Sequence, residues 1–165
     1  KSVIPLEEEL KLATLHLELE QLRFENRFTY HITIAEGIDP SQTYVPALIL
    51  NPILENAIWH GLLPVKDQWF GNLTIDCYPE DGKILLVIED NGAGRRSTAE
   101  RTEDNHDSRG IQLTEQRLAN IIFLYNISST TCRFDDLLNA DGSPAGTRVT
   151  IVISASLTPL VHEQN

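Results

Sequence analysis

Residues 50–66 read LNPILENAIWHGLLPVK, and their apolar residues recur at the spacing of a buried helix. We expect this helix to begin with Asn51 as its N-cap and Pro52 as its first helical residue. Asn accepts a hydrogen bond from a free amide at a helix start, and Pro needs no partner there. The helix should continue through Asn56 to about Leu62.

A second helix is expected upstream, from Pro5 to about Phe24, because Pro and then three glutamates suit the positive end of a helix. Its apolar residues form two stripes on opposite sides. The first stripe consists of Leu6, Leu10, Ala13, Leu17 and Phe24, and the second of Leu12, Leu15, Leu19 and Leu22. One stripe can pack on the domain. The other either lies between pieces of the same domain or is built for helices outside the chain or for a second subunit.

Alternating and β-branched runs indicate the strands, which turn residues separate. We expect strands at 27–35, 73–78, 84–89, 130–134 and 146–154, with turns at 79–82 and 139–142. The polar run 95–109 should form a loop, and an apolar stripe over 111–125 predicts a third helix. The pattern indicates one α/β (α+β) domain built as a two-layer sandwich, with a frayed tail after Pro159.

Composition argues against several classes of function. A formal charge of −11 disfavours nonspecific binding to nucleic acid or to a membrane surface, since both need clustered cations. Cys77 and Cys132 lack metal-site spacing. No run approaches the roughly 20 apolar residues of a membrane-spanning helix. The chain begins at Lys1 without any Met, and we expect it to be part of a longer protein.

Asp90, Gly92 and Gly94 form a DNGAG segment directly after an expected strand. Asp, Asn and Gly are the usual residues of a hairpin turn, so a plain turn is one interpretation. The other is a nucleotide site. A carboxylate at the strand end accepts the amino group of adenine, and the glycines let the backbone approach the base.

The helix over residues 50–62 carries polar groups suited to a phosphate site. The Asn56 side chain offers an uncharged oxygen for Mg²⁺, and Glu55 beside it can polarise a water or a hydroxyl. His60 lies four residues after Asn56 and should share its face, although a structural helix-end histidine is the alternative. Gly110 suggests a helix start that presents amides to phosphate, or an ordinary loop glycine.

Four segments together resemble the LytS-like family of sensor histidine kinases, in the family's order and spacing. They are LNPILENAIWHGLLPVK, IEDNGAGR, SRGIQLTEQRL and GTRVTI, and LELEQLRFENRF resembles the family's linker to its dimerising helices. The resemblance implies the C-terminal ATP-binding catalytic domain. Its Bergerat (GHKL) fold is a mixed, mainly antiparallel sheet covered by helices on one face, with residues 95–109 in the place of the lid over ATP.

The resemblance also implies roles for individual residues. Asn56 would be the Mg²⁺ ligand, Asp90 the residue that recognises adenine, and Thr147 a water-mediated adenine contact. Gly92 and Gly94 would form the adenine-side loop, Gly110 the phosphate-side turn, and Glu55 and His60 the catalytic groups beside the phosphates. Two positions depart from the family: Trp59 replaces a phosphate-directed Lys, and Gln112 replaces a glycine. The charge that Trp59 lacks would then come from Lys66, Arg95, Arg96 or Arg109.

The family's phosphoacceptor motif, a His followed by Phe-Leu-Phe-Asn, is absent from the chain. We therefore expect a linker helix at 1–26, the catalytic domain at 27–158 and a tail at 159–165. The expected function is delivery of the γ-phosphate of Mg·ATP to an upstream histidine, for relay to a response regulator. The resemblance further implies a full-length homodimer through its dimerisation helices, and a cytoplasmic domain of a membrane-anchored kinase.

Two other functions stay open at this point. A nonenzymatic nucleotide sensor or scaffold would fit the departures at Trp59 and Gln112. A hydrolase or an anti-sigma-type member of the same superfamily would replace the histidine acceptor with water or with a partner's serine. The kinase-like linker over residues 17–28 argues against both.

Overall fold

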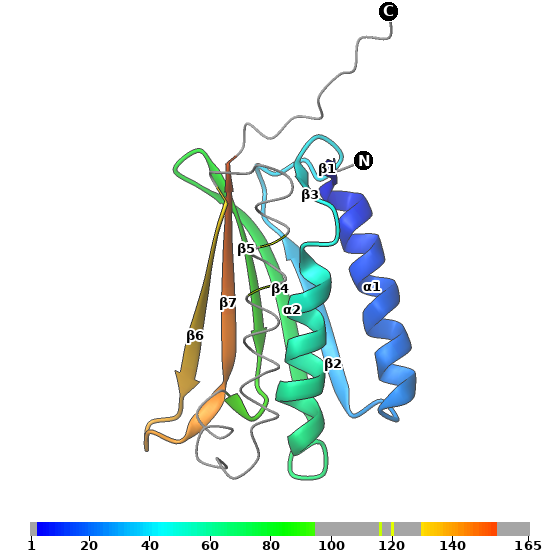
Figure 1. Ribbon diagram of the computed structural model, residues 1–165, viewed down its shortest axis with the longest axis vertical. Helices are drawn as coiled ribbons and strands as arrows, with labels where there is room; N and C mark the ends of the chain where they lie inside the picture. The colour runs from blue at the N-terminus through cyan, green and yellow to red at the C-terminus, as the bar shows by residue number, and fades with distance from the viewer. Residues whose placement is uncertain (1–2, 95–115, 117–119, 121–129, 155–165) are drawn as a thin grey trace, which may run out of the picture.

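The computed structural model describes residues 3–94, 116, 120 and 130–154 (Figure 1). Several sequence predictions lie outside these residues. They are the loop at 95–109 with Arg95, Arg96 and Arg109, the glycine at Gly110, the departure at Gln112, most of the helix at 111–125, and the tail. Among the described residues, no helix is both long and apolar enough to cross a membrane.

The first helix, α1 (Leu6–Arg23), confirms the prediction for the N-terminal segment, although Pro5 is its N-cap rather than part of its first turn. The helix ends because Glu25 and Asn26 adopt positive φ angles, 53° and 56°. The amide of Asn26 donates to the carbonyl of Gln21 at 2.8 Å, which satisfies one of the carbonyl groups at the helix end.

The second helix, α2 (Leu50–Asn56), begins earlier than predicted, with Ile49 rather than Asn51 at the N-cap. The Glu9 carboxylate of α1 caps this helix from outside. It accepts hydrogen bonds from the amides of Leu48 at 3.0 Å and Leu50 at 3.1 Å. The Asn51 cap was therefore wrong because a residue far away in sequence supplies the acceptor.

Beyond Asn56 the helix continues as a π-helix, η1 (Ala57–Leu62), and a 3₁₀ turn, η2 (Leu63–Val65). The predicted end near Leu62 is confirmed. The wider π turn was not predicted, and such turns often occur at functional sites.

A five-stranded sheet has the order β2-β4-β5-β7-β6. Its strands are β2 (Phe28–Ile34), β4 (Gly71–Glu80), β5 (Lys83–Asp90), β6 (Thr131–Leu138) and β7 (Pro144–Ser154). The β2–β4 pair is parallel and the other three pairs are antiparallel, which confirms the mixed, mainly antiparallel sheet. A small pair of β1 (Val3–Pro5) with β3 (Tyr44–Pro46) was not predicted.

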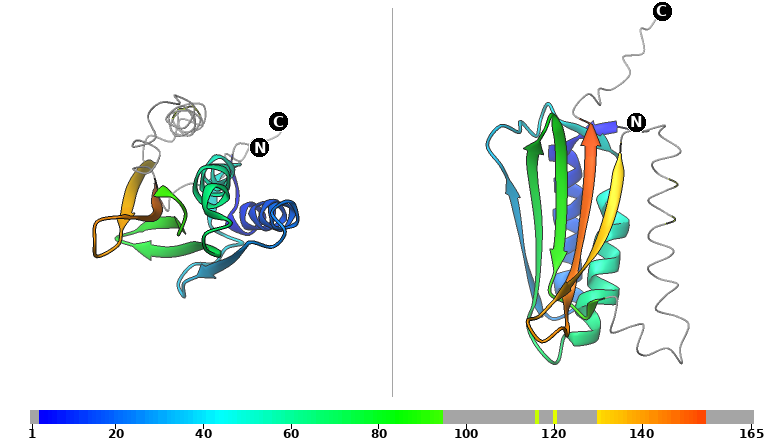
Figure 2. Two further views of the ribbon diagram at one scale, coloured as in Figure 1. Left: turned by 90° about the horizontal axis from the view of Figure 1, so that it is seen from below. Right: turned by 90° about the vertical axis from the view of Figure 1, so that its left-hand side faces the viewer.

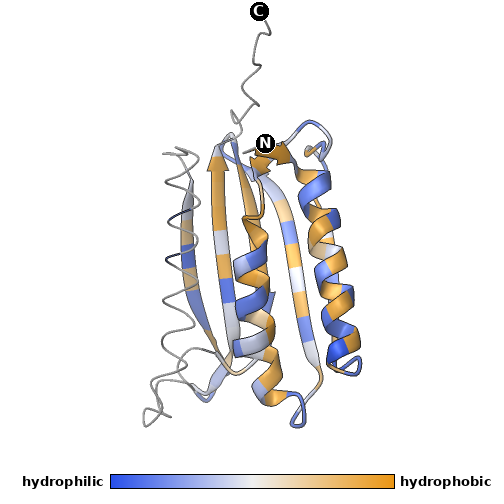
Figure 3. Ribbon diagram, turned by 45° about the vertical axis from the view of Figure 1, so that its right-hand side comes forward, coloured by the Kyte–Doolittle hydropathy of each residue, from blue (hydrophilic) through white to orange (hydrophobic). Residues whose placement is uncertain are grey.

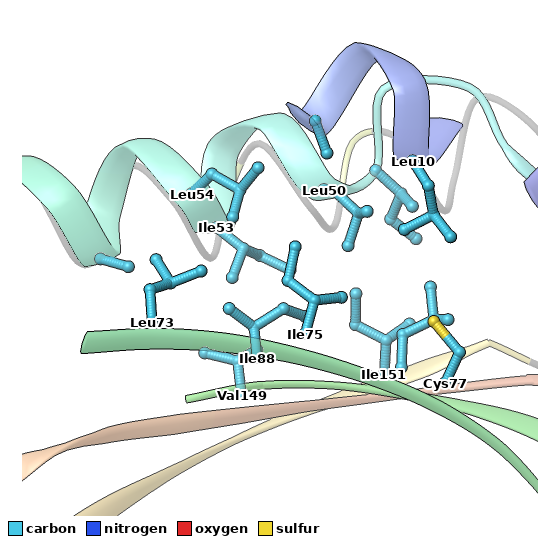
Figure 4. Packing of buried hydrophobic residues seen from close by; sticks show 14 of the residues in the cluster. Leu10, Leu50, Ile53, Leu54, Leu73, Ile75, Cys77, Ile88, Val149 and Ile151 are labelled. Atoms are coloured by element: carbon cyan, nitrogen blue, oxygen red, sulfur yellow. The ribbon is translucent and has the colours of Figure 1, made fainter. Parts of the chain in front are cut away.

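Helices α1 and α2 lie on one face of this sheet (Figure 2), as the predicted sandwich requires. Figure 4 shows Leu50, Ile53 and Leu54 of α2 packed over side chains of the central strands. The strand residues include Leu73, Ile75, Ile88, Val149 and Ile151, all at most 3% exposed. Each such side chain contributes about 1.5–3 kcal/mol when it is buried.

The two stripes of α1 differ in burial. Leu6, Leu10, Ala13 and Leu17 of the first stripe belong to the same core as the sheet, and Phe24 packs against it. The leucines of the second stripe are exposed. One core therefore joins α1 to the strands, and the division of the chain between residues 26 and 27 stays a prediction.

Candidate functional site

The end of β5 and the π turn that follows α2 meet at Asp90. This residue closes β5 and lies opposite Thr147 of β7 in the strand register. Its side chain comes close to Gly61 at the end of η1. Segments that are far apart in the sequence therefore converge here, and they include the Asp90, Gly92 and Thr147 positions predicted for adenine.

Asp90 is 5% exposed, which is unusual for a carboxyl group. Burial raises the pKa of Asp90 to about 7, against an opposing effect of hydrogen bonds from the Gly92 and Thr147 amides. The Gly92 amide donates to Oδ1 at 2.9 Å. A buried carboxyl group of this kind is a strong candidate for ligand recognition, because its desolvation is only partly offset by these donors.

Two glycines allow this close approach. A Cβ atom at Gly61 would lie 2.8 Å from Oδ1 of Asp90, and a Cβ atom at Gly92 would overlap the backbone of Gly61. The same contact is secured by the Ala93 amide, which donates to the Gly61 carbonyl at 2.9 Å. Side chains at these positions would push the helix end away from the strand end.

Two further glycines, Gly146 and Gly94, are packed closely beside the backbone of Asp90 and beside each other. Gly146 has a φ of 125°, and a Cβ atom there would overlap the carbonyl oxygen of Asp90. Gly94 lies against Pro144 and the carbonyl of Gly146. No role was predicted for Gly61 or Gly146 from the sequence. Their position inside the quoted motifs was the only available signal.

The loop after Asp90 is held by its own side chains. Asn91 accepts the amide of Asn72 on its Oδ1 at 2.6 Å and donates from Nδ2 to the carbonyl of Phe70 at 3.2 Å. The indole of Trp69 donates to the carbonyl of Asn91 at 2.8 Å. These bonds fix the direction in which the chain leaves Asp90.

Asn56 lies one helical turn before His60 and is 6% exposed. Its Oδ1 is buried and has no hydrogen-bond partner among the residues that the structure describes. An unsatisfied amide oxygen suits a hard cation such as Mg²⁺. No group of three or more His, Cys, Asp or Glu side chains gathers as a metal site in the described part, so an ion there would depend on substrate oxygens and water.

Glu55 and His60 are placed less directly. The Nδ2 atom of Asn51 donates a hydrogen bond to Glu55 at 3.4 Å, and the Oδ1 atom of Asn51 bonds Nδ1 of His16 on α1 at 2.7 Å. Glu55 therefore lies on the side of α2 that is near α1. His60 is half-buried within η1, where the wider π turn alters the α-helical spacing assumed from the sequence. Their catalytic roles stay predictions.

Trp59 packs toward α1. Its ring meets Phe24 edge to face with centroids 5.3 Å apart, and the guanidinium carbon of Arg23 lies 5.8 Å from the ring centroid. Arg23 also pairs with Glu20 at 3.1 Å. Lys66 follows η2, and its backbone carbonyl accepts hydrogen bonds from Nε of Arg27 at 3.1 Å and from Nη2 of Arg27 at 2.7 Å. Trp59 thus has a packing role at the position of the expected phosphate-directed lysine.

Similar proteins are sensor histidine kinases, although no protein-family model matches the chain. Sensor histidine kinase BtsS of Escherichia coli is 31% identical over 115 residues, which are 70% of this chain and 19% of BtsS. Sensor protein LytS of Bacillus cereus is 28% identical over 126 residues, or 76% of this chain and 20% of LytS. The chain thus spans about a fifth of the length of these relatives.

Solved structures show the same fold. A solved chain of the mycobacterial sensor histidine kinase MprB has a TM-score of 0.59 at 20% identity, over 92% of this chain and 95% of the solved one. The catalytic domain of histidine kinase ThkA has a TM-score of 0.58 at 12% identity, over 93% and 94% of the two chains. Both matches extend over almost the whole of each pair of chains.

Proposed function

The chain belongs to the LytS-like sensor histidine kinases, and from this premise we propose that it binds Mg·ATP and donates the γ-phosphate to a histidine on another segment of the kinase. A response regulator would then receive the phosphoryl group. We extend the proposal to a full-length homodimer joined by dimerisation helices, with this domain on the cytoplasmic side of a membrane-anchored protein.

One observation carries the proposal: the buried Asp90 carboxyl group is held between a glycine-lined helix end and strand β7. An ionised carboxylate only accepts hydrogen bonds. The exocyclic amino group of adenine donates one, whereas guanine has a carbonyl at the same ring position. This difference supports ATP over GTP as the ligand.

Asn56 would hold Mg²⁺ through its unsatisfied Oδ1, and the ion would supply positive charge to the phosphate oxygens. Gly92 and Gly94 would keep the backbone close to the base, and Thr147 would reach it through water. Gly110 would present amides on the phosphate side. Glu55 and His60 would lie beside the phosphates, where Glu55 orients or deprotonates the attacking imidazole.

Calorimetric titration tests the nucleotide site. We expect ATP to bind more tightly than GTP and more tightly with Mg²⁺ than without it. Replacing Asn56 by alanine should remove most of the Mg²⁺ effect and leave adenosine binding unchanged, because adenosine has no phosphates. Equal affinity for ATP and GTP would contradict the adenine role of Asp90. An unchanged Mg²⁺ effect in N56A would contradict the metal role.

Transfer is tested separately with the full-length kinase and γ-labelled ATP, with label on histidine as the expected product. Trp59 favours one other function, because it packs on Phe24 and Arg23 at the position of the family's lysine. In a nonenzymatic sensor, ATP would bind with adenine selectivity and no histidine would become labelled. The two assays together therefore distinguish a kinase from a sensor.

A further inference from the structure

The outer face of α1 carries four exposed leucines. Leu12, Leu15, Leu19 and Leu22 are 46%, 64%, 57% and 73% exposed, and hydrophobic segments recur along the helix in Figure 3. Their alternating spacing of three, four and three residues is that of the a and d positions of a coiled coil. Scattered single leucines are common on surfaces, but a heptad-spaced row is a helix-docking pattern.

The apolar surface continues beside this row. A groove of about 610 Å³ between α1 and the edge strand β2 is lined by Leu15 together with Leu10, Ile32 and Ile34. Leu15 therefore belongs to both the leucine row and the groove. The apolar area is larger than the leucine row alone.

The charged residues that flank the leucine row indicate which helix could pack against it. With Leu12 and Leu19 at a positions, Glu18 occupies a g position and Arg23 the following e position. In a parallel pair, Glu18 of each copy faces Arg23 of the other copy. In an antiparallel pair with the same leucines in contact, Glu18 would approach Glu18. The preceding g and e positions hold Lys11 and His16, which add no attraction in the parallel pair, so the contact between Glu18 and Arg23 favours this orientation.

From these features we propose that the outer face of α1 packs against the same face of a second copy of this chain, as a parallel coiled coil. The position of α1 permits this, because the helix lies at the outer edge of the described structure (Figures 1 and 2). A twofold axis parallel to α1 would leave the two sheets on opposite sides. Glu18 accepts a hydrogen bond from the Tyr30 hydroxyl at 3.4 Å, and Arg23 bonds Glu20 and lies near the Trp59 ring. The Arg23 side chain is nevertheless 59% exposed, and a guanidinium has five N–H donors, more than these contacts use.

Two heptads bury little surface. The contact is well below the roughly 800 Å² per partner of a standard interface, so the chain alone should dimerise weakly. We expect a monomer in dilute solution and a growing dimer fraction at high concentration, with or without nucleotide. The surface is separate from the Asp90 site, and its test does not depend on the proposed function.

Cysteine cross-linking tests both contact and orientation. Equivalent a positions face each other only in a parallel pair, so L19C in a C132S background should form a disulfide-linked dimer under mild oxidation. Cys77 is buried and should not interfere. The matched control is K83C, an exposed position on the β4–β5 hairpin. Equal cross-linking of L19C and K83C would overturn the proposal.

Sedimentation equilibrium supplies the second measurement. L15S/L19S should lose the dimer while keeping the wild-type melting temperature, because both leucines are mostly exposed. E18R should weaken the dimer, and E18R/R23E should restore it by exchanging the charges. A wild-type chain that stays monomeric at the highest soluble concentration refutes the proposal. A dimer that survives L15S/L19S, or is indifferent to E18R, refutes this interface.

Discussion

A methyl group added at Gly61 would lie 2.8 Å from Oδ1 of Asp90 and 3.2 Å from its Cγ. Asp90 is 5% exposed, so its carboxyl group has little room to retreat. We expect the G61A variant to turn this group and weaken its bond from the Gly92 amide, which is 2.9 Å long in the native chain. The carboxyl group would then no longer point where the adenine amino group is proposed to bind.

Two opposing effects decide the stability of G61A. Alanine is favoured over glycine by about 1 kcal/mol in a helix interior, whereas overpacking costs about 1–3 kcal/mol. The net loss should be at most about 2 kcal/mol, so the protein should fold. The proposed hydrogen bond from the adenine amino group to the Asp90 carboxylate should contribute about 1.5–3 kcal/mol, the usual range for a charged acceptor. Loss of this bond should weaken ATP binding by roughly tenfold to 100-fold.

Calorimetric titration with ATP measures the affinity of G61A, and thermal unfolding measures its stability. The control is G82A in the β4–β5 turn, where an added Cβ meets nothing within 4 Å but the φ of 73° strains a side chain. G82A should lose stability and keep the native affinity. A folded G61A with native ATP affinity would show that the carboxyl group of Asp90 does not recognise adenine.

Three further outcomes follow from Asp90 and Glu9. Burial raises the pKa of Asp90 from 3.8 to about 7, so the folded state holds a proton that the unfolded state releases between these values. The free energy of unfolding should therefore fall as pH rises from about 4 to about 7, and urea titrations of D90N should lose this contribution. Adenosine needs the ionised carboxylate, so its affinity should fall as pH drops below about 7, and D90N should bind adenosine weakly at every pH. Adenosine is the better ligand here because phosphate groups titrate near pH 6. Replacing Glu9 by alanine should destabilise the fold by about 1–3 kcal/mol in urea unfolding, since the buried amide of Leu50 loses its acceptor, whereas E8A should be nearly neutral.

The strands and helices that local pattern determines were predicted well. The β4–β5 hairpin is an example: its turn residues Asp81 and Gly82 have φ angles of 50° and 73°, β4 alternates buried and more exposed residues, and β5 is a mostly apolar run. Nothing beyond these residues is needed to place the turn. The inner stripe of α1 was likewise recognisable from its 3.6-residue period.

The errors and omissions occur where distant segments meet. The cap of α2 was assigned to Asn51 because the sequence offered it locally, whereas the real acceptor is Glu9 of α1. Gly61 and Gly146 were not given roles, because only the folded chain brings both against Asp90. The sequence also left the outer leucines of α1 with two explanations. Their exposure favours docking over cover from the same domain.

Glu20, Asn56 and Thr130 have buried polar atoms without a hydrogen-bond partner in the described structure, and Asn56 belongs to the segment that leads to the Asp90 site. Asn56 closes α2, and η1, which continues it, contains Gly61, which lies against the buried carboxyl group of Asp90. Burying such groups without partners costs stability, so a chain selected for stability alone would pair them or replace them. A ligand that brings an amino group to Asp90 and a cation to Asn56 removes both costs at once. The same penalty falls on a ligand that lacks either group, and this is the physical basis for expecting Mg·ATP rather than a generic nucleotide.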